Sequence, residues 1–216
     1  SSRLLKVKTP EHPIFLESIA YIRSQIGMTG LNGAQQSVLE RIIHSSGDLS
    51  MQSYLRFSSN SCEEAINALK KGASIVTDTY MAKSAVSPIA KRTLNSNVKC
   101  ILEMAPEFID SSSKTRSAIG MRKMWLDLEQ KETCLEGPVV VIGSAPSALM
   151  VLLDLIQKDV KRPSLIIGMP VGFIGVSECK TRLLKSDCSH IVLEGSKGGA
   201  SLAAATVNAL LRAADD

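Results

Sequence analysis

The sequence predicts an α/β fold: a single doubly wound domain over residues 1–216, with a mostly parallel sheet of about five strands and a helical N-terminal region. Three observations predict this fold. Residues 138–214 repeat one order three times: an apolar run, a turn of small residues and a helical pattern. The apolar runs are continuous rather than alternating, which is typical of parallel strands buried on both faces. No low-complexity linker divides the chain, so we expect one domain.

The N-terminal third predicts two helices. The first covers residues 12–26 and places Pro13 in its first turn, where the missing N–H of proline removes no helical hydrogen bond. The second runs from Asn32 to Ser45 and stops before Gly47, which suits a helix end. Four apolar residues of this second helix form one stripe that should face the core: Val38, Leu39, Ile42 and Ile43.

The middle of the chain predicts two strands and two helices. Residues 73–78 and 99–104 are short apolar runs, and we expect each to form a strand. Residues 81–94 between them have a helical pattern, in which Pro88 suits a first turn or a kink. After three serines, a further helical pattern begins at Arg116.

The second half predicts three strand–turn–helix units. The strands are expected at 138–143, 163–168 and 190–195, and the helices at 148–159, 176–186 and 200–214. Parallel strands joined through helices have right-handed crossovers, so the three glycine-containing turns should lie along one edge of the sheet.

Composition excludes several classes of function. Hydrophobic residues make up 44% of the chain and aromatic residues only 4%, and the net charge is +4. So few aromatic rings and so mild a charge argue against nucleic acid and are compatible with a small acidic ligand. The most apolar run, 148–156, is short and contains Asp154, so we expect no membrane-spanning segment.

The five cysteines have no C-x-x-C spacing, and no cluster of His, Cys, Asp or Glu has the spacing of metal ligands. We therefore expect neither a disulfide framework nor a metal site, and an odd number of thiols indicates a reducing cytoplasm. The dinucleotide pattern G-x-G-x-x-G and the phosphate loop G-x-x-x-x-G-K-[ST] are also missing, which disfavours nicotinamide, flavin and nucleoside triphosphates.

The loop after the strand at 163–168 is the predicted ligand position. It carries Gly168, Gly172 and a third glycine within eight residues, so a large flat ligand could lie against its backbone amides. The turn SKGG, with Lys197 and Gly198, could likewise hold a carboxylate or phosphate through N–H groups and one ammonium.

His44 is the candidate general acid. It lies three residues after Arg41 in the second helix, so both side chains share a face away from the apolar stripe. The negative end of the helix dipole favours a protonated imidazole there. The alternative is that His44 only caps the helix carbonyls. His12, at a helix start, and His190, at a strand start, are expected to be structural.

Two further charged residues have a functional and a structural interpretation. Arg116 opposes the dipole at a helix start and could face an anion, or it is a solvated surface residue. Asp78 ends a predicted strand, where α/β proteins place ligand-binding groups, or it is the N-cap of the next helix.

Motifs in order along the whole chain carry a resemblance to a known family. They are ES at 17–18, R-x-x-H-x-x-G-D at 41–48, D-x-x-M at 78–81, TRSA at 115–118, IG-x-AP at 142–146, GMPVGFIG-x-x-E-x-K at 168–180 and KGG at 197–199. GMPVGFIG with E-x-K is the most specific of them. The chain resembles the precorrin-8X methylmutase family of cobalamin biosynthesis, also called cobalt-precorrin-8 methylmutase.

The resemblance implies an isomerase that moves a methyl group from carbon 11 to carbon 12 of a contracted tetrapyrrole, giving hydrogenobyrinic acid or its cobalt form without an external cofactor. It implies that His44 is the catalytic acid and that Ser18 and Arg41 contact the substrate. Arg116, Lys197 and the glycine loops would then meet the substrate's acetate and propionate groups. The resemblance also implies a homodimer.

The chain departs from the family pattern at three positions: Ser144 replaces an amide, Ser196 replaces a cation, and Ile19 replaces an aromatic residue. Two other functions stay open at this point. One is a nucleotide-dependent oxidoreductase or transferase on a similar sheet, because a fold alone does not fix function. The other is a corrinoid carrier without catalysis.

Overall fold

A computed structural model describes residues 10–109 and 114–216. They form a six-stranded sheet with the order β1-β6-β5-β4-β2-β3, in which only β1 runs antiparallel to its neighbour. The strands are β1 Leu55–Phe57, β2 Ile75–Thr77, β3 Val98–Cys100, β4 Val139–Ile142, β5 Leu165–Gly168 and β6 His190–Leu193. The α-helices are α1 Pro13–Ile26, α2 Gly33–Ser46, α3 Met51–Tyr54, α4 Ser61–Lys70, α5 Tyr80–Arg92, α6 Arg116–Lys131, α7 Pro146–Ile156, α8 Val176–Lys185 and α9 Ala200–Asp215.

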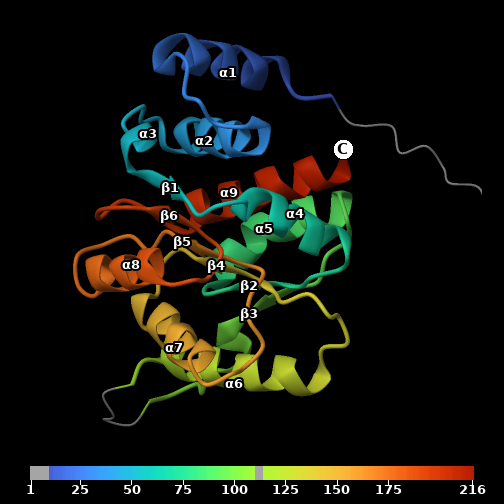
Figure 1. The fold of residues 1–216 in the computed structure, drawn as a ribbon, viewed down its shortest axis with the longest axis vertical. Coiled ribbons are helices and arrows are strands. Elements are labelled where there is room, and N and C mark those ends of the chain that lie inside the picture. The colour runs from blue at the N-terminus through green and yellow to red at the C-terminus, as the bar shows by residue number, and fades with distance from the viewer. Residues whose placement is uncertain (1–9, 110–113) are drawn as a thin grey trace, which may run out of the picture.

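Helices cover both faces of the sheet (Figure 1). Alternate residues of β4 show why: Val139 and Val141 belong to an apolar cluster with α2, α4, α5 and α9, whereas Val140 and Ile142 belong to one with α6, α7 and α8. This alternation is the two-residue period of a strand whose two faces are both buried. α1 lies outside the first helical layer and packs on α2 (Figure 1).

The predicted α/β class, parallel sheet and helical N-terminal region are confirmed. The sheet has six strands rather than about five, because β1 was not predicted. This strand has only three residues and pairs antiparallel with β6, so Leu55 lies opposite Leu193. The expected strand at 99–104 is wrong in its second part, since Ile101–Met104 forms a 3₁₀ helix, η1. Pro88 lies inside α5 and not in its first turn.

The parallel ladder brings the loops of the predicted ligand edge together. β6, β5 and β4 are neighbours, so the loops that follow them leave the sheet at one edge, as predicted. β2 pairs with β4 on the other side, and Asp78, the residue after β2, therefore lies beside the loop that begins at Gly143.

Across residues 10–109 and 114–216, no helix has both the length and the apolar character that crossing a membrane requires. All five cysteines are free thiols, and four of them are buried.

Candidate functional site

Two pairs of side chains meet where α1 crosses α2. Phe15 and Ser18 are three apart on α1, and Arg41 and His44 are three apart on α2, so each pair shares a helix face. The Ser18 Oγ lies 2.7 Å from the His44 Nδ1. The Phe15 ring stands edge-on to the imidazole, with centroids 5.1 Å apart and ring planes at 83°. Ser18 and Phe15 thus orient the imidazole from α1.

His44 itself is exposed, in the last turn of α2. The helix is ended by Gly47, which has a left-handed conformation and donates its N–H to the Ile43 carbonyl at 2.8 Å. His44 makes its hydrogen bond to the neighbouring helix, so the alternative in which it only caps carbonyls is not what the structure shows. An oriented imidazole with an accessible second nitrogen is suited to proton transfer.

Arg41 is held by two contacts. Its guanidinium Cζ lies 4.4 Å from the Phe15 ring centroid, a cation–π distance, and its Nη2 donates to the Glu11 Oε1 at 2.7 Å. Only 16% of the Arg41 side chain is exposed, compared with 43% for Glu11. The Phe15 ring therefore touches both functional side chains of α2, and the sequence analysis did not identify it. An aromatic three residues before Ser18 on the same helix was the available signal.

A groove runs along α9 between α2 and α5. Its larger part is a hollow of about 700 Å³ lined by Glu11, Arg41 and Arg92, and its smaller part, of about 220 Å³, is lined by Arg41, His44 and Asn208. Arg41 and Arg212 line both parts. The residues that α9 contributes are otherwise mostly small: Ser201, Ala204, Ala205, Ala209 and Ala213. A floor of small side chains leaves room for a wide ligand beside His44.

Asp78 is fully buried and accepts hydrogen bonds from the loop after β4. Its Oδ2 accepts from the backbone N–H of Ser144 and of Ala145, each at 2.7 Å, and its Oδ1 accepts from Gly143 at 3.1 Å. Burial raises the pKa of this carboxyl, and the backbone N–H groups oppose the shift. The N-cap of α5 is Thr79, so the N-cap interpretation of Asp78 is wrong. Asp78 holds the IG-x-AP backbone in place.

Lys180 has the corresponding role for the KGG turn, and the sequence analysis did not identify it. Its side chain is buried, and its Nζ donates to the Gly195 carbonyl at 2.7 Å and to the Lys197 carbonyl at 3.0 Å. Burial lowers the pKa of Lys180 to about 8. The E-x-K part of the most specific motif was the available signal for this residue.

The glycines of the same edge permit close packing. A Cβ on Gly198 would lie 2.8 Å from the Met169 carbonyl carbon, and one on Gly168 would lie 2.6 Å from the Leu183 Cδ2. Gly172 donates its N–H to the Ser196 carbonyl at 2.9 Å, which joins the two loops directly. Neither part of the groove is lined by a residue of 168–175, so the hollow beside His44 is not at the loop where the sequence predicted the ligand.

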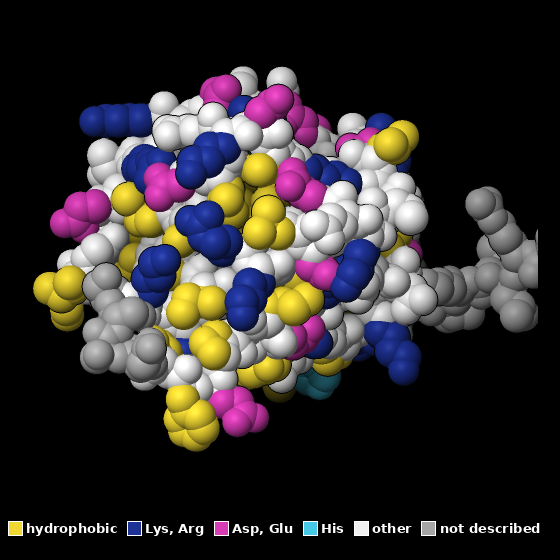
Figure 2. Space-filling view, turned by 90° about the horizontal axis from the view of Figure 1, so that it is seen from below, with side chains coloured by type: hydrophobic (Ala, Val, Ile, Leu, Met, Phe, Trp, Pro, Cys, Tyr) yellow, Lys and Arg dark blue, Asp and Glu magenta, His cyan; other side chains and the backbone are white. Residues whose placement is uncertain are grey.

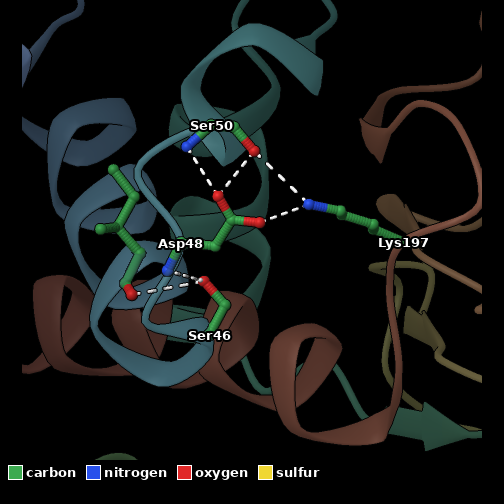
Figure 3. A network of polar contacts seen from close by, with 5 residues as sticks. Ser46, Asp48, Ser50 and Lys197 are labelled. Atoms are coloured by element: carbon green, nitrogen blue, oxygen red, sulfur yellow. Dashed lines mark hydrogen bonds and ion pairs between the residues drawn. The ribbon is translucent and has the colours of Figure 1, made fainter.

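Lys197 connects this edge to the end of α2 (Figure 3). Its Nζ is hydrogen-bonded to the Asp48 carboxylate, whose Oδ1 accepts from the Ser50 backbone N–H at 2.9 Å and from the Ser50 Oγ at 2.6 Å. The Lys197 ammonium and the Ser50 donors lower the pKa of Asp48 to about 2. The charge of Lys197 is thus balanced by the last residue of the R-x-x-H-x-x-G-D motif.

The other candidates lie apart from the groove. Arg116 is exposed at the start of α6, on the opposite face of the sheet, and its Nε donates to the Pro106 carbonyl at 2.8 Å. His12 accepts from the Ile14 N–H as the N-cap of α1, and the buried His190 ring contacts the Cys188 carbonyl at 2.9 Å; these contacts suit the structural roles predicted for both. The structure brings together Ser18, Arg41 and His44, which the resemblance had connected.

Comparison with known proteins shows the family of the chain. The model of a family described as precorrin-8X methylmutase matches residues 13–213. The chain is 34% identical to the cobalt-precorrin-8 methylmutase of Synechocystis sp., over 93% of this chain and 95% of the relative. It is 35% identical to the precorrin-8X methylmutase of Pseudomonas aeruginosa, over 91% and 93%. The crystal structure of precorrin-8x methyl mutase from Thermus thermophilus superposes with a TM-score of 0.82 at 32% identity, covering 94% of this chain and 96% of that one.

Proposed function

The chain belongs to the precorrin-8X methylmutase family, and we propose that its His44 is the general acid and base of the methyl migration. The protein is an isomerase that converts precorrin-8X, or its cobalt form, into hydrogenobyrinic acid or the cobalt equivalent. The observation that carries the proposal is the orientation of an exposed imidazole by Ser18 and Phe15 at the edge of the groove.

The contact with Ser18 supports separate roles for the two imidazole nitrogens. In the imidazolium, Nδ1–H donates to the Ser18 Oγ, which leaves the Nε2 proton to be donated to a substrate ring nitrogen. Positive charge then spreads through the conjugated ring and eases the shift. The bond from the methyl group to carbon 11 breaks while its bond to carbon 12 forms. Nε2 takes back the proton, so the reaction consumes no other reagent.

Arg41 supplies binding rather than proton transfer. Its guanidinium presents a planar set of N–H donors and lines both parts of the groove. The substrate carries acetate and propionate groups, and a bidentate guanidinium–carboxylate contact fixes both position and orientation. Lys197, Asp78, Arg116 and the glycines Gly168, Gly172 and Gly198 stay predicted contacts. The partners that the structure gives them support a role in holding the loops.

The experiment that tests the proposal is His44→Ala with His12→Ala as its matched control, since both histidines are exposed and lie near α1. We expect His44→Ala to lose about 10²- to 10⁴-fold in kcat, the usual contribution of a general acid, while still binding hydrogenobyrinic acid. His12→Ala should keep its rate. Turnover is followed by the change in visible absorbance, and full turnover by His44→Ala would refute the assignment.

The same assay addresses the alternatives. A corrinoid carrier would bind hydrogenobyrinic acid but show no rearrangement in the wild type. A nucleotide-dependent enzyme would be stabilised against heat by NAD or ATP and not by a corrinoid. Relatives named for the cobalt-free and for the cobalt-containing substrate match at similar identity. The mass of a copurifying pigment distinguishes these two substrates.

We further propose that residues 1–216 act as one domain, that the protein forms a homodimer and that it acts in the cytoplasm. The single sheet, which takes strands from both halves of the chain, supports the first proposal. Native mass spectrometry tests the second, because a monomer mass at micromolar concentration would contradict it. Fractionation of the producing cells tests the third.

A further inference from the structure

Arg212 is a half-buried cation in the groove that neither the sequence analysis nor the resemblance identified. It belongs to α9 and lines both parts of the groove, as Arg41 does. Among the residues that the structure describes, its guanidinium has no hydrogen bond and no ion pair. A guanidinium carries five N–H donors, and the half-buried Arg212 uses none of them within the described part of the protein, so a ligand in the groove can accept from them.

The charges around Arg212 indicate what the partner is. Burial and the positive charges of Arg41 and Arg92 lower the pKa of Arg212, and Glu11 opposes that shift. Three further charged residues line the same hollow and have partners of their own: Arg92, Asp215 and Asp216. Guanidinium groups that repel one another in a concave site are stabilised together by an anion, and a planar carboxylate matches their geometry.

A second polar atom without a partner lies one turn earlier on α9. The Asn208 Nδ2 donates to the Ala85 carbonyl at 3.2 Å, whereas its Oδ1 is buried without a hydrogen bond. Asn208 and Arg212 both line the smaller part of the groove, next to His44. The buried Asn208 Oδ1 and the Arg212 guanidinium, which has no bond within the described residues, lie on successive turns of one helix and indicate that this surface is shaped for a polar ligand.

Glu11 shows how a carboxylate sits beside these arginines. It lines the larger part of the groove and its Oε1 is 2.7 Å from the Arg41 Nη2. Glu11 precedes α1 and its side chain is 43% exposed. An ion pair with such an exposed partner contributes little stability, so a ligand carboxylate can replace it at small cost.

We propose that Arg41 and Arg212 together bind one peripheral carboxylate of the corrinoid, which displaces Glu11 from Arg41. This inference rests on the proposed function, and it adds a residue that determines specificity for a ring bearing free acids. It also places that part of the ring along α9, in the groove whose smaller part is lined by both Arg212 and His44.

The test is the binding of hydrogenobyrinic acid, and of the same ring with its carboxylates converted to methyl esters, to Arg212→Gln. Arg122→Gln is the matched control, because Arg122 is exposed on α6 and α6 covers the face of the sheet opposite α9. Figure 2 shows the molecule from the side on which α6 and α7 lie in Figure 1. We expect Arg212→Gln to bind the acid about tenfold more weakly, as loss of a charge-assisted contact implies. Its preference for acid over ester should fall by the same factor, whereas Arg122→Gln should match the wild type.

Glu11→Gln tests the displacement. Removing the competing carboxylate should tighten binding of hydrogenobyrinic acid by about twofold to fivefold, the range of a weak exposed ion pair. The gain should vanish in the Arg41→Gln background, because Glu11 then has no arginine to occupy. Unchanged or weaker binding by Glu11→Gln would overturn the displacement.

The outcomes separate this inference from the proposed function. If wild-type protein does not bind hydrogenobyrinic acid, the proposed function fails. If the wild type binds it and Arg212→Gln binds acid and ester as the wild type does, only the role of Arg212 is overturned. Should Arg212→Gln not fold, Arg212→Lys replaces it. The lysine ammonium lacks the planar geometry of a guanidinium, so this variant should still lose part of the preference for acid over ester. An unchanged preference would contradict the proposal.

Discussion

The crossing of α1 and α2 and the glycine-rich edge of the sheet are built in opposite ways. At the crossing, side chains contact side chains: Ser18 and Phe15 orient His44, which is exposed. At the edge, buried charges hold the backbone: Asp78 accepts from the loop after β4 and Lys180 donates to the loop after β6. We therefore expect the first region to lose a side chain with little loss of stability, and the second to lose stability when one of its buried charges is changed.

This difference shows that the region with the most sequence motifs need not be the region that contacts the ligand. The edge contains GMPVGFIG, E-x-K and KGG, yet the contacts of Gly198 and Lys180 are with the protein's own backbone. Buried polar groups must find partners, so residues that satisfy a loop are as constrained as residues that bind a ligand. A motif therefore identifies constrained positions without telling which constraint acts.

The largest expected effect is on stability, at Asp78. Asp78→Asn replaces one acceptor oxygen by a donor that faces backbone N–H groups, so we expect a loss of about 3 kcal/mol or more in the free energy of unfolding. Urea denaturation measures it. Asp127→Asn is the control, because Asp127 forms an i,i+4 surface pair with Lys131 and should cost less than about 1 kcal/mol. Equal costs would contradict the supporting role of Asp78.

The second largest loss of stability is expected for Gly198→Ala. Its Cβ would lie 2.8 Å from the Met169 carbonyl carbon, so the two loops must separate, at a cost of about 2 to 3 kcal/mol by the usual range for overpacking. Gly33→Ala is the control, because nothing lies within 4 Å of its Cβ position at the start of α2, and it should be neutral or stabilising. Thermal denaturation of both variants decides, and equal melting temperatures would show that the edge tolerates a side chain.

Ser18→Ala should change activity and leave stability nearly unchanged, in contrast with the edge. The lost hydrogen bond frees the imidazole to rotate, and we expect kcat to fall about threefold to tenfold, in line with one net hydrogen bond. Ser24→Ala removes a hydroxyl from the same helix that donates to the Tyr21 carbonyl and accepts from the Gln25 side chain, and its kcat should not change because neither partner belongs to the site. A Ser18 variant with full activity would imply that Phe15 alone orients His44.

The smallest effect is a pH dependence of stability at Lys180. Its pKa is lowered from 10.5 to about 8 on folding, so between these values the unfolded chain binds more protons and stability rises with pH. Relative to Lys180→Met, the wild type should gain roughly 1 kcal/mol between pH 8 and 9. Urea denaturation at both pH values measures the difference. Parallel pH profiles of the two proteins would show that the ammonium is not desolvated.

Much of the fold follows from local pattern. The apolar runs at β4, β5 and β6 and the helices between them were predictable because strand and helix periods involve residues close in sequence. β1 was not predictable, since three residues carry no period and the pairing partner lies on β6, far along the chain. The same holds for η1, whose apolar residues resemble a strand.

The site divides in the same way. Arg41 and His44 share a helix face because they are three residues apart, and that relation is local. The partners of Asp78 lie 65 to 67 residues away, and those of Lys180 lie across a loop, so burial decided whether these charges bind backbone or ligand. Arg212 had no local signal, because an arginine near a helix end is ordinary on a surface.

The sequence by itself determined the parallel sheet, the two N-terminal helices and the histidine whose position suits proton transfer. Only the tertiary structure decided that Ser18 contacts this histidine, that the glycine edge is held by buried Asp78 and Lys180, and that Arg212 joins Arg41 in the groove. The physical reason is that backbone periodicity is set between neighbours in the chain. The partner of a buried charge depends instead on which segments, distant in sequence, pack around it and remove it from water.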